Sequence, residues 1–292
     1  MNESTPSVEK HLTVCKSEQT ILDCLSENCP QISRQKLKLA MKYGAVWLTP
    51  KAQNNQSRNT IRIRRAKKLL QKGDQVHLYY NEAILFSEFK PARLVSDEGE
   101  YSIWDKPCGM FSQGTKWGDH TAITRWVELF GLSQNDLLER SCFLVHRLDR
   151  ATSGLIIVAH SKKAAQLLSE LFENRKIDKQ YSVRVKGQYP SATTMQRLTR
   201  DIDGKSAATI VISSEYLVDK NQTSLILKID TGRKHQIRKH LSEVGYAIIG
   251  DRLYGEYIIN GEGRSDLMLK SCYLAFECPI TQNQMCYQLS VL

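Results

Sequence analysis

The segment HRLDRATSG occupies residues 146–154, and the apolar run LIIVA follows it at residues 155–159. Three side chains that can carry a positive charge surround its aspartate, Asp149: His146, Arg147 and Arg150. Nearby cations hold an aspartate ionised, and an ionised aspartate can act as a nucleophile or as a base. A surface loop in which Asp149 caps Thr152 or pairs with Arg150 accounts for the same residues. This segment alone therefore leaves both a catalytic and a structural Asp149 open, ahead of a predicted buried strand.

Two further segments carry residues that suit chemistry. GRKHQIRKH at residues 232–240 is predicted to begin a helix, with His235 and Arg238 on neighbouring faces. Their donors suit an RNA phosphate or the Asp149 carboxylate, although an exposed basic helix end has the same composition. Tyr181 begins a predicted strand, a position where a lone tyrosine is usually a packing residue.

The bulk composition is that of a globular protein able to bury a core. A length of 292 residues with 41% hydrophobic residues suits a small domain beside a larger one. No apolar run approaches the ~20 residues that span a bilayer, and the first residues, MNESTPSVEK, do not resemble a signal peptide. We therefore expect a cytoplasmic monomer with no membrane partner and no obligate protein partner.

The eight cysteines are irregularly spaced and include no CxxC pair. In a reducing compartment this pattern predicts free thiols rather than disulfides or metal ligands. The sequence contains no GxGxxG and no GxxxxGK[ST], which argues against nucleotide-driven chemistry. A kinase-like interpretation of His-Arg-x-Asp fails because no glycine-rich loop and no DFG accompany it. We expect neither a metal nor a cofactor.

The net charge of +10 is concentrated in one segment. Between Gln31 and Gly73 there are twelve basic residues and no acidic one, whereas the rest of the chain is slightly acidic. Such a concentration is typical of a surface that binds a polyanion. The absence of interleaved acids disfavours a merely solvated helix face, and no strongly amphipathic helix or lipidation motif supports a membrane surface. The residues that we expect to bind RNA are Arg34, Lys38, Lys42, Arg62, Arg64 and Arg65.

The N-terminal part of the chain has a recognisable order of elements. A loose tail is predicted over 1–18, and it is followed by a helix from Ile21, a basic helix over 34–42 capped by Ser33, a strand over 45–48, a loop over 51–59 and a strand over 75–80. This order over residues 19–82 resembles the small RNA-binding fold named after ribosomal protein S4. One departure is Trp47-Leu48-Thr49-Pro50, which replaces the usual Val-Asn-Gly. The resemblance implies RNA contacts from the second helix.

The rest of the chain is predicted to alternate strands and helices. The strands are expected at 101–105, 155–159, 181–185 and 225–229, and the helices at 122–130, 162–174 and 232–241.

Motifs in residues 95–290 resemble, in order, those of the RluA-type family of pseudouridine synthases. HRLDRATSG matches the HRLDxxTSG signature, and KQYSVRVKG matches a Lys-x-Tyr-x-x-x-Val-x-Gly strand. Asp105-Lys106-Pro107-Cys108-Gly109 resembles a Lys-Pro-x-Gly turn, and Gly204-Lys205-Ser206-Ala207 resembles Gly-Lys-Pro-Ala with Ser206 in place of proline. GRKHQIRKHL and Gly250-Asp251-Arg252-Leu253-Tyr254-Gly255 follow GRxHQIRxHL and GDxxYG. An S4-type domain in front is a common arrangement in this family.

The resemblance implies an α+β fold in which a mixed, mainly antiparallel central sheet forms the catalytic domain over 95–292. A linker over 83–94 would join it to the small α/β S4-like domain over 19–82. The implied catalytic residues are Asp149, Tyr181, which stacks on the extruded uracil, and Arg238, which pairs with Asp149. Arg147 is implied to enter the RNA where the target nucleotide leaves. With Arg147, the residues that we expect to bind substrate are His146, Arg233 and His235.

The implied reaction converts uridine to pseudouridine in a structured RNA, either ribosomal or transfer. The nucleotide must leave the folded RNA at a cost of roughly a few kcal/mol, and stacking on Tyr181 can return about 1–3 kcal/mol. Asp149 would either attack the anomeric carbon or remove a sugar proton, and both routes stay open. The alternative function is a non-catalytic RNA-binding protein, in which the second domain is a platform.

Overall fold

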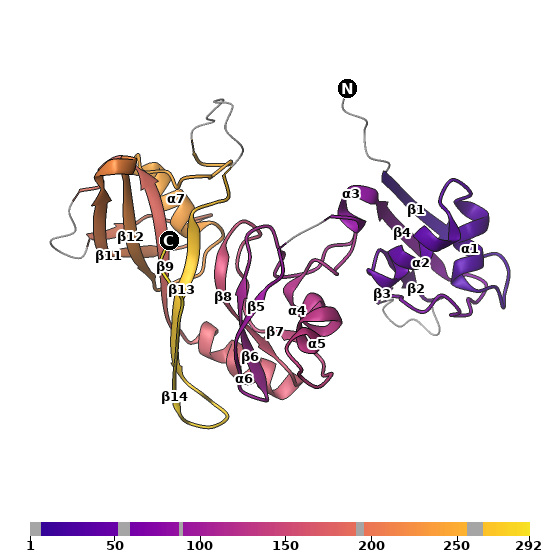
Figure 1. The fold of residues 1–292 in the computed structure, drawn as a ribbon. Coiled ribbons are helices and arrows are strands. Elements are labelled where there is room, and N and C mark those ends of the chain that lie inside the picture. The colour runs from indigo at the N-terminus through magenta and orange to yellow at the C-terminus, as the bar shows by residue number, and fades with distance from the viewer. Residues whose placement is uncertain (1–6, 52–58, 88–89, 191–195, 256–264) are drawn as a thin grey trace. The chain divides into compact units, whose positions relative to one another are not determined.

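The structure is a computed structural model that describes residues 7–51, 59–87, 90–190, 196–255 and 265–292. Contacts divide the chain into two compact units. The first unit comprises Met1–Phe89 and Gln113–Arg125, and the second comprises Lys90–Ser112 and Trp126–Leu292 (Figure 1).

The first unit packs two helices against a small antiparallel sheet (Figure 1). Among its described residues the strand order is β1-β4-β2-β3. Its elements are β1 (Ser7–Thr13), α1 (Ile21–Asn28), α2 (Arg34–Lys42), β2 (Val46–Thr49), β3 (Ile61–Arg62), β4 (Gln75–Asn81) and α3 (Glu82–Leu85). Thr20 caps α1 and Ser33 caps α2, each by accepting a backbone N–H three residues later. The apolar faces of the helices then close the core through Ile21, Leu25 and Leu37.

The expectation of a loose tail over 1–18 is wrong for residues 7–13, which form β1. This strand pairs with β4 from Ser7 opposite Asn81 to Thr13 opposite Gln75. Val8 and Leu12 lie against the core on one face, while the residues between them are largely charged or polar. The alternation has period two, but with only two apolar residues it is too weak a pattern to stand out in the sequence. Residues 1–6, and residues 52–58 of the expected loop, lie outside the described residues.

Residues 113–125 pack within the first unit. The Asp119 carboxylate forms ion pairs with the guanidinium groups of Arg62, at 2.8 Å, and of Arg64. The His120 ring stacks on Tyr43 with centroids 4.0 Å apart. This segment therefore belongs to the N-terminal core, although the chain reaches it only after entering the second unit.

The second unit is built on a large, mainly antiparallel sheet, which confirms the expected α+β class. In the described residues, ten strands follow the order β10-β11-β12-β9-β13-β8-β6-β5, with β14 beside β13 and β7 beside β8. The strands are β5 (Arg93–Asp97), β6 (Tyr101–Lys106), β7 (Phe143–Leu144), β8 (Ser153–Ala159), β9 (Asp178–Lys186), β10 (Gln196–Thr199), β11 (Ala208–Leu217), β12 (Gln222–Ile229), β13 (Leu269–Glu277) and β14 (Gln284–Gln288). The longer helices are α6 (Lys162–Glu173) and α7 (Gln236–Glu243).

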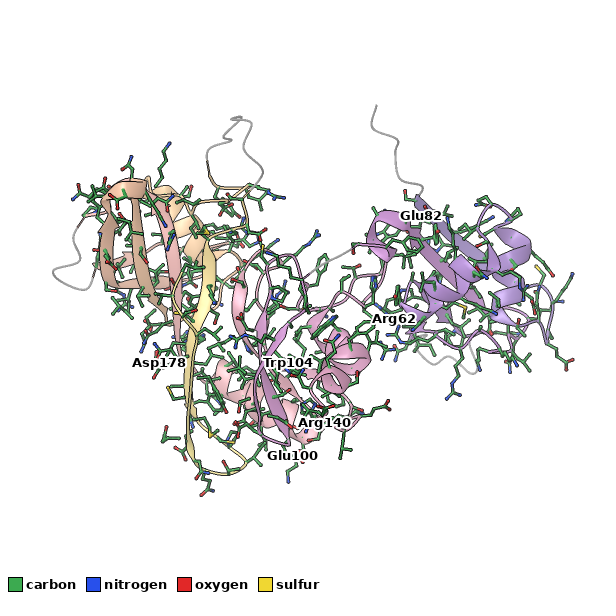
Figure 2. The ribbon with its side chains drawn as sticks, in the orientation of Figure 1. Arg62, Glu82, Glu100, Trp104, Arg140 and Asp178 are labelled. Carbon is green, nitrogen blue, oxygen red and sulfur yellow. The ribbon has the colours of Figure 1, made fainter. Side chains whose placement is uncertain are left out.

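The helix expected over 122–130 is interrupted. The chain forms α4 (Ile123–Trp126), a π-helical turn at Val127–Gly131 and α5 (Leu132–Gln134). Gly131 faces the ring of the fully buried Trp104, whose position in the core of the sheet Figure 2 labels. A wider turn accommodates this contact, as π-helical turns inside helices commonly do.

Strand β13 joins the two halves of the sheet. It enters between β9, to which it is antiparallel, and β8, to which it is parallel over Lys270 and Ser271. Gly154 of β8 has φ +107°, and a Cβ added to it would overlap the backbone of Ser271. Only glycine allows this conformation and this close approach together. The residue after Ser153 in the HRLDRATSG segment is thus dictated by sheet assembly.

We expect Gly154→Ala to lower the free energy of unfolding of the second unit by about 2–4 kcal/mol, through overlap with Ser271 and strain at positive φ. Urea unfolding followed by circular dichroism measures the loss. Gly187→Ala is the matched control, because Gly187 has φ +78° with no atom within 4 Å of its added Cβ. Equal losses in both variants would show that the β8–β13 approach is not a tight constraint.

Candidate active site

A cavity of about 320 Å³ lies in the second unit. Four chain segments form its wall: the loop before β8, strand β9, the chain from the end of β12 into α7, and the start of β13. The lining residues are Arg147, Leu148, Asp149, Thr152, Tyr181, Ile229, Gly232, Arg233, Lys234, His235, Gln236, Ile237, Arg238 and Leu269. Six of the seven residues predicted to be catalytic or to bind substrate are therefore brought together.

The loop that carries Asp149 is held by backbone contacts on both sides. The Ser112 hydroxyl accepts the N–H of Leu148 at 2.9 Å and donates to the Leu148 carbonyl at 2.6 Å. The fully buried Lys106 donates to the carbonyls of Pro107 and Met110 and, at 3.5 Å, of Arg150. Burial lowers the pKa of Lys106 to about 8. These contacts fix the loop without using the Asp149 carboxylate.

Asp149 itself is little engaged. Arg150 donates to the carbonyl of Gly109 instead of pairing with Asp149, and its guanidinium lies over the Phe111 ring. In the part of the chain that the structure describes, the basic side chain within 4 Å of the Asp149 carboxylate is that of His235, with Nε2 3.8 Å from Oδ2. The Asp149 side chain keeps 23% of its surface exposed, so a ligand in the cavity can reach it.

Tyr181 lies in β9 and faces the same cavity. It is 8% exposed. Burial, and then the negative charge of Asp149, raise the pKa of its hydroxyl, so the phenol stays protonated at neutral pH. An aromatic ring and a carboxylate thus share one wall of the cavity, as the motifs predicted.

Arg238 pairs with Asp251 rather than with Asp149, which corrects the pairing implied by the family resemblance. Its Nε and one terminal nitrogen donate to the two carboxylate oxygens of Asp251, both at 2.7 Å. The Asp251 side chain is fully buried, so its charge requires such a two-pronged partner. Burial alone would raise the pKa of Asp251. The hydrogen bonds from Arg238 and from the N–H groups of Leu253 and Tyr254 outweigh this effect, so the pKa of Asp251 is lowered overall.

Helix α7 begins at Gln236, not at Gly232 as expected. The buried Gln236 side chain accepts hydrogen bonds from the Thr231 hydroxyl and from the N–H of Arg233, and it donates to the Ala208 carbonyl at 2.9 Å. His235 then takes a left-handed conformation, with φ 55°. Gln236 thereby shapes a tight turn before the helix, a role that helical periodicity does not reveal.

The His235 ring is held from the side opposite Asp149. Its Nδ1 lies 2.9 Å from the hydroxyl of Tyr254. Burial is the largest of the effects that lower the pKa of His235, so the imidazole is neutral at neutral pH. Neither Tyr254 nor Gln236 was predicted as a site residue. Their positions in the matched motifs GDxxYG and GRxHQIRxHL were the feature of the sequence that could have identified them.

Of the remaining predicted substrate-binding residues, Arg147 and Arg233 line the cavity, and His146 does not. The His146 Nε2 accepts the backbone N–H of Ile157 at 3.0 Å, and its ring stacks on Phe172 with centroids 4.2 Å apart. Burial lowers the pKa of His146 to about 3. A neutral histidine with these partners holds β8 in place, outside the lining of the cavity.

The residues predicted to bind RNA lie in the first unit and fall into two groups. Arg62 and Arg64 are committed to Asp119, and Arg62 also donates to the Thr115 carbonyl and stacks over Trp47. Figure 2 labels Arg62 in this unit. Arg34 pairs with the exposed Asp23. Among the described residues, the exposed Lys38, Lys42 and Arg65 have no acidic partner within 4 Å.

Among the described residues, no group of three or more His, Cys, Asp or Glu side chains could hold a metal ion. None of the helices that these residues form is long and apolar enough to cross a membrane.

Comparison with known proteins identifies the family. The family model for RNA pseudouridylate synthases matches residues 100–243. An RNA pseudouridine synthase of Aquifex aeolicus is 30% identical over 262 residues, which cover 82% of this chain and 77% of the relative. The dual-specificity RNA pseudouridine synthase RluA of Escherichia coli is 40% identical over 167 residues, or 52% of this chain and 72% of that enzyme. A solved structure, human RNA pseudouridylate synthase domain containing 1, shares the fold with a TM-score of 0.54 at 20% identity, covering 69% of this chain and 86% of that one.

The match to the relative from Aquifex aeolicus extends over most of both proteins, and three of the matched motifs, HRLDRATSG, KQYSVRVKG and GRKHQIRKHL, meet in one cavity. The chain therefore belongs to the RluA-type family of RNA pseudouridine synthases, and it is an isomerase.

Proposed function

We propose that this enzyme isomerises specific uridines in structured RNA, ribosomal or transfer, and that Asp149 is its catalytic carboxylate. The observation that carries the proposal is the cavity that combines the accessible, little-engaged Asp149 with Tyr181. The name of the Escherichia coli relative, a dual-specificity RNA pseudouridine synthase, supports an RNA substrate of more than one kind.

The proposed reaction requires the target nucleotide to leave the RNA fold and enter the cavity. Extrusion costs roughly a few kcal/mol, and stacking of the uracil on Tyr181 returns about 1–3 kcal/mol. Arg147, which is exposed at the cavity wall, would take the place that the nucleotide leaves. The bond from C1′ to N1 then breaks, the uracil turns, and a bond from C1′ to C5 forms while C5 loses its proton and N1 gains one.

Asp149 acts in its ionised form, either by attack on C1′ or by removal of a sugar proton. Arg238 lines the same cavity and adds a positive charge there, while its hydrogen bonds are taken by Asp251. His235 and Arg233 supply further donors at the same wall.

The proposal extends to the first unit and to the state of the protein. Residues 19–82 would form an S4-like RNA-binding domain, joined through residues 83–94 to a catalytic domain over 95–292, of which residues 113–125 belong to the first unit. The successive helices α1 and α2, with Lys38 and Lys42 exposed on the second, support this assignment. We also propose that the enzyme acts as a cytoplasmic monomer.

We expect Asp149→Asn to reduce tritium release from RNA labelled at uridine C5 by about 10³-fold or more, because the amide can neither attack nor accept a proton. RNA affinity should be unchanged. Asp178→Asn is the control: this carboxylate pairs with Lys228 at 2.8 Å and does not line the cavity (Figure 2). If neither wild type nor Asp149→Asn released tritium while both bound RNA, the protein would be a non-catalytic RNA-binding platform.

We expect the double substitution Lys38→Ala, Lys42→Ala to weaken RNA binding and to reduce the slope of log K against log salt by about 1–2, because two phosphate contacts are lost. The test is to measure RNA affinities at salt concentrations from about 50 to about 200 mM, a range over which such slopes are determined. Lys162→Ala, Lys163→Ala removes two exposed charges from α6 and should leave the slope unchanged. An unchanged slope in both doubles would argue against RNA binding by α2.

A further inference from the structure

The turn Gly250-Asp251-Arg252-Leu253-Tyr254-Gly255 holds Arg238 through Asp251, and it also places Tyr254 beside His235. Asp251 accepts the N–H of Tyr254 at 3.1 Å, and the Tyr254 carbonyl accepts the Ser242 hydroxyl at 2.7 Å. The Arg238 guanidinium lies 5.1 Å from the centre of the Tyr254 ring. The Tyr254 backbone is therefore anchored by the same buried carboxylate that holds Arg238.

His235 stands between this anchored tyrosine and the carboxylate of Asp149. Its Nδ1 lies 2.9 Å from the Tyr254 hydroxyl, and its Nε2 lies 3.8 Å from Oδ2 of Asp149. The two rings are nearly perpendicular, at 73°. Each ring nitrogen of His235 therefore faces one partner. The left-handed backbone of His235 further restricts the orientation of its ring.

A neutral histidine carries one ring proton, and the surroundings decide where it is. A proton on Nε2 points an N–H dipole at the Asp149 carboxylate, whereas a proton on Nδ1 points the Nε2 lone pair at it, which is repulsive. The first arrangement leaves Nδ1 as an acceptor, so the Tyr254 hydroxyl must be the donor. The charges that face His235 are Asp149, which favours protonation, and Arg238, Lys234 and Lys239, which oppose it together with burial.

We propose that Tyr254 is a positioning residue, whose hydroxyl donates to Nδ1 of His235 and keeps the proton on Nε2, so that this N–H orients the Asp149 carboxylate for reaction. The inference rests on the proposed role of Asp149. A neutral donor suits this task, because its N–H dipole, 3.8 Å from Oδ2, attracts one carboxylate oxygen while the other remains reactive. A full positive charge at the same place would lower the basicity of Asp149.

The test compares Tyr254→Phe with wild type by two measurements. Nitrogen NMR of ¹⁵N-imidazole-labelled protein at pH 8 reports which nitrogen of His235 is protonated, with His235→Gln used to assign the signal. We expect the Nε2–H form in wild type and a mixture of both forms in Tyr254→Phe. In the tritium-release assay, kcat of Tyr254→Phe should fall on the order of 10-fold with KM unchanged, because the carboxylate is less well oriented.

Two sets of control variants separate positioning from general structural damage. Tyr246→Phe removes a hydroxyl that donates to the Gln188 carbonyl in the same unit, and it should change neither tautomer nor kcat. His235→Gln, whose amide nitrogen can replace Nε2–H, should retain more activity than His235→Asn, whose shorter amide cannot reach Asp149.

The proposal is overturned if wild-type His235 carries its proton on Nδ1, or if Tyr254→Phe leaves the tautomer unchanged, whether or not kcat falls. It is also overturned if the tautomer changes without any effect on kcat. Because the NMR measurement does not depend on turnover, an inactive wild type would refute the proposed function while the tautomer assignment is still decided.

Discussion

The insertion of β13 between β8 and β9 is the constraint on which the catalytic unit depends. The Asp149 loop leads into β8, and Tyr181 lies in β9, so each of these residues belongs to a different half of the sheet. A strand that comes more than a hundred residues after Asp149 closes the gap between them, and the backbones of Gly154 and Ser271 approach closely there. This junction therefore connects the two strands that bring Asp149 and Tyr181 to the cavity.

A second constraint, the buried pair of Arg238 and Asp251, organises the opposite wall. A buried carboxylate is stable only with its charge and its lone pairs satisfied, and Asp251 meets this need through Arg238 and two backbone N–H groups. The arrangement has a chemical benefit as well. Because the guanidinium is occupied elsewhere, it contributes positive potential to the cavity without blocking the oxygens of Asp149.

Sequence motifs predicted the residues of the cavity well and their pairings less well. Asp149, Tyr181 and Arg238 could be selected because each occupies a fixed position in a motif, and the sheet then brings them together. The partner of Arg238 could not be predicted in this way, because Asp149 and Asp251 stand in separate motifs and only burial distinguishes them. Strand β1 was missed because Val8 and Leu12 are a short apolar pattern among polar residues.

The N-terminal basic segment shows the limit of counting charges. Twelve cations without an acid indicated a polyanion-binding surface, but Arg62 and Arg64 meet Asp119, which is more than fifty residues further along the chain. A composition window cannot contain such a partner. The structure thus narrows the predicted surface to cations such as Lys38 and Lys42 that keep their charge exposed.

The left-handed backbone of His235 has an evolutionary consequence. Glycine or asparagine would adopt this conformation with less strain, so a histidine here gives up stability, on the order of 1 kcal/mol. Selection for thermostability would therefore favour replacement of His235. Such variants would exchange activity for stability, since the strained side chain is the one that faces Asp149.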